Sequence, residues 1–352
     1  MSFGQTLSRS FHDCRGLIGT AAFLLASVIV ASFCMGGRFS DLTFVLPSLA
    51  LSIAFVVGAF TLVFLGLYPV ALWSEYRAKT LTIKNVRVKV DAWAAHYFDS
   101  GRFTEGLPLF LAILLMIFII PFMKSMIQYI HPYGIDPLLE HWDTVLHGGM
   151  NPQEWIAPII EKTGFVSVLN ITYNLWFPVM LGAYWYAAFL DGDRCRRMRF
   201  LWASLLGWVI LGGILATLAS SVGPLFYGDF ISGNNPYESY IAHLVEVNKT
   251  HTLLSLSVAA ILLDMSKDSS IIDANGISAM PSMHLAVATL VTLYAFDCRK
   301  LMGVFAALFL LLILTGSIYL GWHYAIDGYA GILGAGLIYS AIKYLGRSEE
   351  HD

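Results

Sequence analysis

Long apolar stretches alternate with short polar segments along most of the 352-residue chain. A helix needs about 20 residues to cross a hydrocarbon core of roughly 30 Å, and about eight stretches come near or exceed that length. They are Leu17–Met35, Leu42–Trp73, Leu107–Met123, Phe165–Leu190, Leu201–Val222, Ile277–Phe296, Leu301–Gly321 and Ile326–Ile342. This pattern predicts an all-α, polytopic membrane protein with about eight transmembrane helices.

Two apolar stretches do not fit a single crossing. Leu42–Trp73 is overlong and contains Pro47 and Pro69, so the pattern does not fix its ends. Thr252–Leu263 is too short to span, and we expect it to lie at the interface or to re-enter the membrane. The composition, 57% hydrophobic and 13% charged, argues against a water-soluble helical bundle of this size.

Lysine and arginine residues give the crossings a direction. If the N-terminus is cytoplasmic, the inner segments hold most of these cations, as the positive-inside rule requires. The outer segments hold Arg38, Lys124, Lys162, Lys249 and Lys267. We therefore expect both termini on the cytoplasmic side. The basic run from Arg194 to Arg199 is then a topology anchor against anionic lipid, and no nucleic-acid partner is expected.

The charge pattern also divides the chain. Residues 1–74 form two leading crossings, and residues 75–106 form a basic cytoplasmic segment with amphipathic character at the inner leaflet. Residues 107–345 contain the remaining six crossings. We expect this last region to be the catalytic membrane domain, because it carries the polar residues described next.

Two histidines stand at the ends of apolar helices on the predicted outer side. His284 follows Pro281-Ser282-Met283 at the start of the sixth crossing, and His323 ends the seventh. Asp327 begins the eighth crossing, four residues after His323. Ionisable groups at this depth of a membrane are costly and point to function. We expect the three side chains to form one site within the outer leaflet.

The residue types suit phosphoryl transfer. If a helix starts near His323, Asp327 lies on the same helix face and can hold a proton on one ring nitrogen. The other nitrogen is then free to attack phosphorus. His284 would protonate the leaving oxygen and later take a proton from the acceptor. Ser282 is a suitable N-cap, and the helix start behind it offers N–H groups to a phosphate.

These residues resemble two motifs of the type 2 phosphatidic acid phosphatase superfamily. Pro281-Ser282-Met283-His284 is similar to its second motif, and the stretch from Gly316 to Gly331 is similar to its third. The resemblance covers roughly residues 107–345. It implies a six-helix core in which His323 forms a phosphohistidine, His284 is the acid/base and Asp327 orients the nucleophile. It also implies a membrane lipid phosphate as substrate, with no cofactor.

The chain departs from the family pattern in its phosphate-binding cations. It contains no Arg-Pro dipeptide, so the first motif is missing, and Ser317 replaces the arginine of the third. This combination is more similar to the branch containing the inositol phosphorylceramide synthases, which favours transfer to an alcohol. The acceptor would be inositol, another polyol or a lipid alcohol.

The sequence leaves open what replaces the missing cations. The residues we expect to contact the substrate are Ser282, Ser317, Tyr319, Lys249 and Tyr173. Several outer histidines and carboxylates have spacings that match no known ligand set, so no metal is expected.

Two other functions remain open at this stage. A phosphatase acting on polyprenyl or sphingoid phosphates would use the same residues with water as acceptor. A non-enzymatic lipid transporter or binding scaffold would tolerate the loss of His323 or Asp327.

Overall fold

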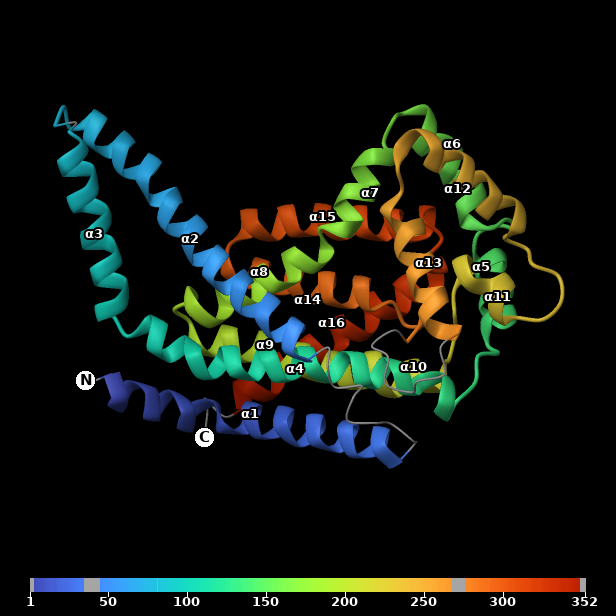
Figure 1. Cartoon of the computed structure of the whole chain (residues 1–352), viewed down its shortest axis with the longest axis horizontal. Coiled ribbons are helices and arrows are strands. Elements are labelled where there is room, and N and C mark those ends of the chain that lie inside the picture. The colour runs from blue at the N-terminus through green and yellow to red at the C-terminus, as the bar shows by residue number, and fades with distance from the viewer. Residues whose placement is uncertain (1–2, 35–44, 81, 268–275, 349–352) are drawn as a thin grey trace.

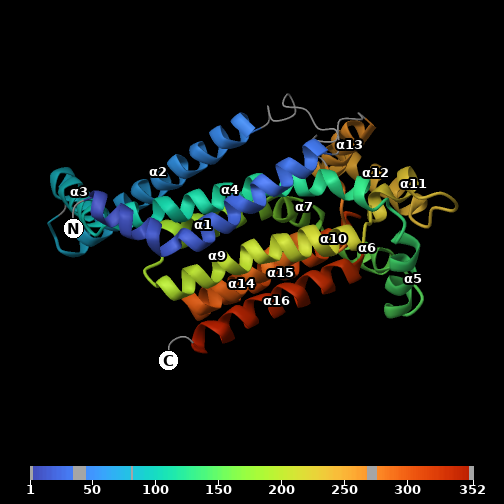
Figure 2. The same ribbon diagram turned by 90° about the horizontal axis from the view of Figure 1, so that it is seen from below.

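Helices account for all the regular structure in the computed structural model, which describes residues 3–34, 45–80, 82–267 and 276–348. Most of the long helices run side by side along the longest axis of the molecule (Figure 1). They are α1 (Phe3–Cys34), α4 (Arg102–Ile130), α9 (Arg194–Val209), α14 (Met283–Cys298), α15 (Lys300–Tyr319) and α16 (Ala325–Ser348). The start of α1 and the end of α16 lie at the same end of this bundle (Figure 2).

The remaining helices lie at the two ends and on one flank. The helices α2 (Val45–Arg77) and α3 (Ile83–Asp99) form a hairpin that leans away from the bundle at the end where α1 starts (Figure 1). The opposite end carries α5 (Asp136–Leu146), α6 (Pro152–Lys162), α11 (Tyr227–Phe230) and α12 (Glu238–His251). The others are α7 (Val166–Asn174), α8 (Trp176–Phe189), α10 (Ala216–Leu218) and α13 (Leu254–Lys267).

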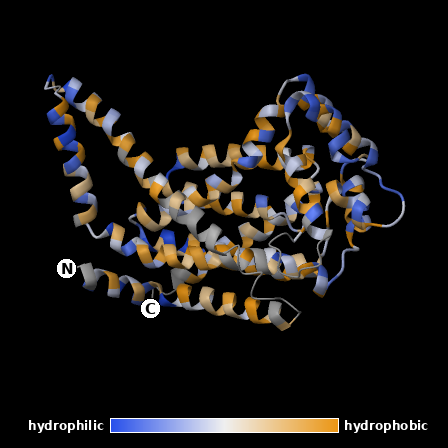
Figure 3. Ribbon diagram, viewed as in Figure 1, coloured by the Kyte–Doolittle hydropathy of each residue, from blue (hydrophilic) through white to orange (hydrophobic). Residues whose placement is uncertain are grey.

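Several helices have the length and apolarity of membrane spans. In the described part of the chain, four qualify on their own, and up to six if each of two bent pairs is one span. The four are Gln5–Ala31, Arg194–Leu218, Lys300–Tyr319 and Ala325–Leu345. Apolar residues dominate the bundle, whereas hydrophilic residues gather on α3, α6 and α12 (Figure 3). The predicted all-α membrane class is confirmed, with four to six candidate spans where about eight were predicted.

The predicted crossing at 165–190 is broken into α7 and α8, which meet at 42°. Pro178 explains the break, because it has no N–H to donate to the carbonyl of Asn174 one turn earlier. The Asn174 side chain donates to the Asn170 carbonyl, 2.7 Å away, at the same end of α7. The bend turns α7 across the end of the bundle, so that Tyr173 and Trp176 approach the histidine motifs.

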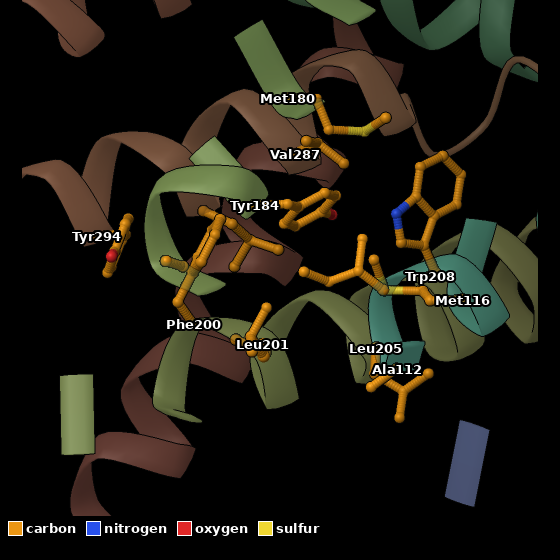
Figure 4. Packing of buried hydrophobic residues seen from close by; sticks show 14 of the residues in the cluster. Ala112, Met116, Met180, Tyr184, Phe200, Leu201, Leu205, Trp208, Val287 and Tyr294 are labelled. Carbon is orange, nitrogen blue, oxygen red and sulfur yellow. The ribbon is translucent and has the colours of Figure 1, made fainter. Parts of the chain in front are cut away.

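The core of the bundle lies between α4, α8, α9 and α14 (Figure 4). Tyr184 and Phe200 are fully buried, and the Phe200 ring stacks on Tyr294 with centroids 4.3 Å apart. Lipid is as apolar as these side chains, so close packing holds such helices together. Gly212, in the π-helical turn Ile210–Leu215 after α9, allows the close approach of α14, since a Cβ there would lie 3.2 Å from the Met283 sulfur.

An ionic cluster lies at the C-terminal end of α8, around Asp191 and Arg196. Asp191, buried in the turn before α9, accepts hydrogen bonds from Arg196, from the Asp193 N–H and from the Tyr294 hydroxyl. Burial alone would raise the pKa of Asp191, but these hydrogen bonds hold it below the usual value of 3.8. The cluster fixes the α8–α9 turn against α14.

Candidate active site

The start of α14 positions His284. Ser282 is the N-cap, and its side chain accepts from the Leu285 N–H at 3.5 Å. Serine is favoured here because its oxygen satisfies an N–H that has no partner inside the helix. The Ser282 N–H donates to the Asp327 carbonyl, 3.0 Å away. Through this bond the start of α14 is tied directly to the first turn of α16.

The turn between α15 and α16 positions His323. Gly321 has φ +76°, a left-handed conformation that favours glycine. Its carbonyl accepts from the Leu225 N–H at 2.9 Å, and the His323 N–H donates to the Ser317 carbonyl at 3.3 Å. Backbone hydrogen bonds therefore hold the turn on both sides of the imidazole, which is 4% exposed.

Asp327 belongs to a capping arrangement at the start of α16. One of its carboxylate oxygens, Oδ2, accepts from the Tyr324 N–H at 3.0 Å, as an acidic residue in a capping box does. The same oxygen lies 3.5 Å from His323 Nδ1. The helix begins at Ala325, two residues after His323, and the carboxylate faces His323. Asp327 is fully buried.

The two imidazoles face each other across a short gap. His323 Nε2 lies 3.4 Å from His284 Nδ1, and the ring centroids are 5.6 Å apart. Because Asp327 lies on the Nδ1 side of His323, Nε2 is the ring nitrogen that faces His284. The neighbouring imidazole of His284 is placed to exchange a proton with a group bound between them.

Aromatic side chains surround His284. The Tyr173 ring stacks on the imidazole with centroids 4.7 Å apart and planes at 22°. The Trp176 ring lies 4.4 Å away, and its indole N–H donates to the His284 carbonyl at 3.0 Å. Tyr173 and Trp176 lie on either side of the bend between α7 and α8, so this bend contributes directly to the site.

Two further carboxylates, both on α5, stabilise the start of α16. Asp143 accepts from the Ala325 and Ile326 N–H groups at 3.0 Å each. Asp136 accepts from the Tyr324 hydroxyl at 3.0 Å and from the Gly223 N–H at 2.9 Å. Burial raises the pKa of Asp143, and the two N–H bonds oppose that shift.

Sequence reasoning did not assign a structural role to the α5 carboxylates. The available signal is their spacing: positions 136, 139 and 143 fall on one face of a helix, and all three side chains are buried. Aspartates that share a helix face with a leucine are expected to be buried with it. A buried carboxyl group needs hydrogen-bond donors, such as the N–H groups at the start of a helix.

A cavity of about 500 Å³ opens beside the histidines. His284, His323, Tyr173 and Lys124 are among its polar lining residues. Part of the apolar lining comes from α4 and α8, namely Ile117, Ile120, Trp176, Phe177, Met180 and Leu181. A volume of this size suits a ligand of a few tens of atoms, with the reacting group at the polar end.

The predicted substrate-binding residues divide into two groups. Tyr173 lines the cavity beside His284. Ser282 and Ser317 are fully buried, and Ser317 donates to the Leu314 carbonyl at 2.9 Å. The other two, which are also outside the cavity lining, make ion-pair or hydrogen-bond contacts elsewhere: Lys249 with Glu246, and Tyr319 with Glu161.

Membrane-length helices are consistent with an integral membrane protein, and two histidines and an aspartate meet at one end of its bundle. The family comparison agrees. A family model described as the PAP2 superfamily matches residues 139–341, more than half of the chain, and the protein belongs to that superfamily. Its members are phosphatases or phosphotransferases that act on lipid phosphates. No curated protein and no solved structure matches the chain.

Proposed function

We propose that this protein is a lipid phosphotransferase that moves a phosphoryl group, or a phosphate with its headgroup, from a lipid phosphate to an alcohol. The observation that carries the proposal is the approach of His323 Nε2 to within 3.4 Å of His284 Nδ1, with Asp327 on the far side of His323. Superfamily membership supports the lipid phosphate substrate.

The reaction would proceed in two displacements. His323 Nε2 attacks phosphorus, the bond to the donor oxygen breaks, and protonated His284 gives its proton to that oxygen. The acceptor hydroxyl then loses its proton to His284 and attacks phosphorus, and the N–P bond breaks to release His323. Asp327 holds the Nδ1 proton of His323 and stabilises the positive charge on the phosphorylated ring.

The start of α14 would bind the phosphate oxygens. Among the described residues, no acceptor is paired with the Met283 or His284 N–H, whereas the corresponding groups of α16 donate to Asp143. Free N–H groups at a helix start favour an anion. Before bond formation phosphorus lies about 3 Å from the attacking nitrogen, so the two rings must separate as the substrate enters.

We also propose the branch of the superfamily, the acceptor and the membrane topology. The branch would be the inositol phosphorylceramide synthase-like one, with inositol, another polyol or a lipid alcohol as acceptor. The chain would cross the membrane about eight times, with both termini cytoplasmic and residues 107–345 as the catalytic domain. The site would then open to the outer leaflet. The common end of the start of α1 and the end of α16, opposite the α5 and α6 end, supports this arrangement.

A transfer assay tests the proposal. Purified protein in lipid nanodiscs is incubated with radiolabelled lipid phosphates, with and without candidate alcohols, and the products are separated by chromatography. We expect label in a new lipid or headgroup product that depends on the alcohol. Release of free phosphate alone would instead assign a phosphatase.

Variants at the site identify the residues responsible. His323→Ala should lose at least about 10³-fold in turnover, because it removes the nucleophile, and should accumulate no labelled protein. His12→Ala, an exposed histidine on α1, is the matched control and should keep full activity. Full activity in His323→Ala would reject the mechanism, and the absence of any turnover by the wild type would favour a transporter or scaffold.

A further inference from the structure

The cavity beside the histidines has to neutralise a phosphate, and its lining includes one cationic side chain among the described residues, that of Lys124. None of these lining residues is acidic. The side chain at position 317, where the family pattern has arginine, is turned to a backbone carbonyl and buried. Lys249 is largely exposed and paired with Glu246.

Lys124 is held in place by the segment that leads to the second motif. Gly276 packs so closely on α4 that a Cβ atom there would overlap the Lys124 carbonyl. The Tyr133 hydroxyl donates to the Ile277 carbonyl at 2.8 Å and fastens the same segment. The segment 276–278 therefore packs on the backbone of Lys124 and leads to the start of α14, where His284 lies.

The position of Lys124 along α4 divides the cavity into two parts. Ile120 and Ile117 lie one and two turns earlier on the same helix face, and Phe177 of α8 lines the same cavity. At 1.5 Å per residue, this apolar wall extends about 10 Å from the lysine. The cavity thus has an apolar part suited to an acyl or prenyl chain and a polar part at Lys124, His284 and His323.

The ammonium group itself indicates an anionic ligand. In the described ranges no hydrogen bond or ion pair joins Lys124 to another side chain, although it is half-buried in an apolar wall. A cation in such surroundings is costly until a counter-charge arrives. Lysine offers three rotatable N–H donors and suits a phosphate as a point charge.

We propose that Lys124 binds the phosphate oxygens of the lipid substrate and takes the place of the cations missing from the motifs. This inference rests on the proposed function, because it assigns the phosphate end of the same cavity. Lys124 lies outside the matched region 139–341, and the assignment depends on the folded position of α4.

Binding without turnover tests the assignment. In the His323→Ala background, dihexanoyl phosphatidate is titrated against the intrinsic fluorescence of the protein, since Trp176 and Trp322 line the cavity. Uncharged dihexanoyl glycerol is the companion ligand. We expect Lys124→Met, which keeps the apolar stem and removes the charge, to weaken phosphatidate binding about 10- to 100-fold and to leave dihexanoyl glycerol binding unchanged.

Companion variants make the result decisive. Lys124→Arg keeps the charge and should recover most of the affinity, and Lys124→Gln supplies a second neutral variant if Lys124→Met does not fold. Lys84→Met, at an exposed position on α3, should behave as wild type. Unchanged phosphatidate binding in Lys124→Met, or a loss seen in Lys249→Met instead, would overturn the proposal.

The outcome is separable from that of the proposed function. If Lys124→Met turns over lipid phosphate with an unchanged KM and kcat, the proposed phosphotransferase function stands and Lys124 does not bind the phosphate. If no lipid phosphate is turned over but phosphatidate binding still depends on Lys124, the anion site stands and the enzymatic function fails.

Discussion

Gly331 lies one turn after Asp327 on α16, where this helix passes the backbone just ahead of His284. A Cβ atom at Gly331 would lie 2.4 Å from the Ser282 carbonyl oxygen and 3.3 Å from the Ala286 nitrogen. Both atoms belong to the hydrogen-bonded start of α14, so neither can rotate away as a side chain could. Gly331→Ala must therefore push the start of α14 away from α16.

The size of the displacement follows from the contact distance. The contact must open by about 0.6–1 Å to reach the 3.0–3.4 Å of the closest tolerated Cβ contacts. Alanine is favoured over glycine within a helix by about 1 kcal/mol, and overpacking costs about 1–3 kcal/mol. The free energy of unfolding should fall by no more than about 2 kcal/mol. Catalysis is more sensitive, because a misplacement of about 1 Å costs about 10²-fold.

We expect Gly331→Ala to lower kcat about 10²-fold while the protein stays folded. Turnover of the lipid phosphate substrate and thermal unfolding in detergent measure the two effects separately. Gly336→Ala is the matched control on the same helix, since no heavy atom lies within 4 Å of a Cβ at that position. It should keep full activity and gain up to about 1 kcal/mol. Equal kcat values for the two variants would refute the reasoning from close packing.

Three further substitutions probe the support of the site and of the fold. Asp143→Ala leaves two buried N–H groups of α16 without their acceptor, so we expect a loss of about 2–4 kcal/mol in unfolding free energy and a fall in kcat; an unchanged melting temperature would contradict this. Trp176→Phe keeps the ring beside His284 but removes the hydrogen bond to its carbonyl, and should lower kcat about tenfold with KM preserved, as steady-state kinetics would show. The pKa of Asp191 is lowered in the folded state, so its ionised form stabilises the protein above the unfolded pKa of about 3.8, and that stability is lost as pH falls through the folded pKa. Asp191→Asn should therefore be destabilised by about 1–3 kcal/mol at pH 7, and its difference from wild type in thermal unfolding should shrink as the pH falls below about 3.8; a constant difference across this range would count against the ionic cluster.

The residue pattern predicts the helices well because membrane helices need long apolar stretches and little else. Positions 284, 323 and 327 could be chosen as one site since each is a polar residue at the end of such a stretch. Their proximity in the fold agrees with that choice, and their chemical roles stay predictions.

Other features depend on contacts between distant parts of the chain. The bond from Ala325 to Asp143 joins residues 182 positions apart, and no local pattern indicates it. The bend between Asn174 and Trp176 is missed because the stretch from Phe165 to Leu190 is long and apolar enough overall to be taken as one crossing. The placement of Lys124 in the cavity requires the packing of 276–278 against α4, which hydrophobic periodicity does not encode.

The two helices that carry the site begin with opposite local electrostatics. Asp136, Asp143 and Asp327 place hydrogen-bonded carboxyl groups around the first turn of α16, whereas the Met283 and His284 N–H groups of α14 have no acceptor among the described residues. Under the proposed mechanism, a phosphate ester that enters the gap would meet free N–H donors on α14 and carboxyl oxygens on α16. This difference would orient the phosphorus atom relative to His323. The same bias would act on donor and product alike, which would keep the transfer stereochemically uniform in both directions.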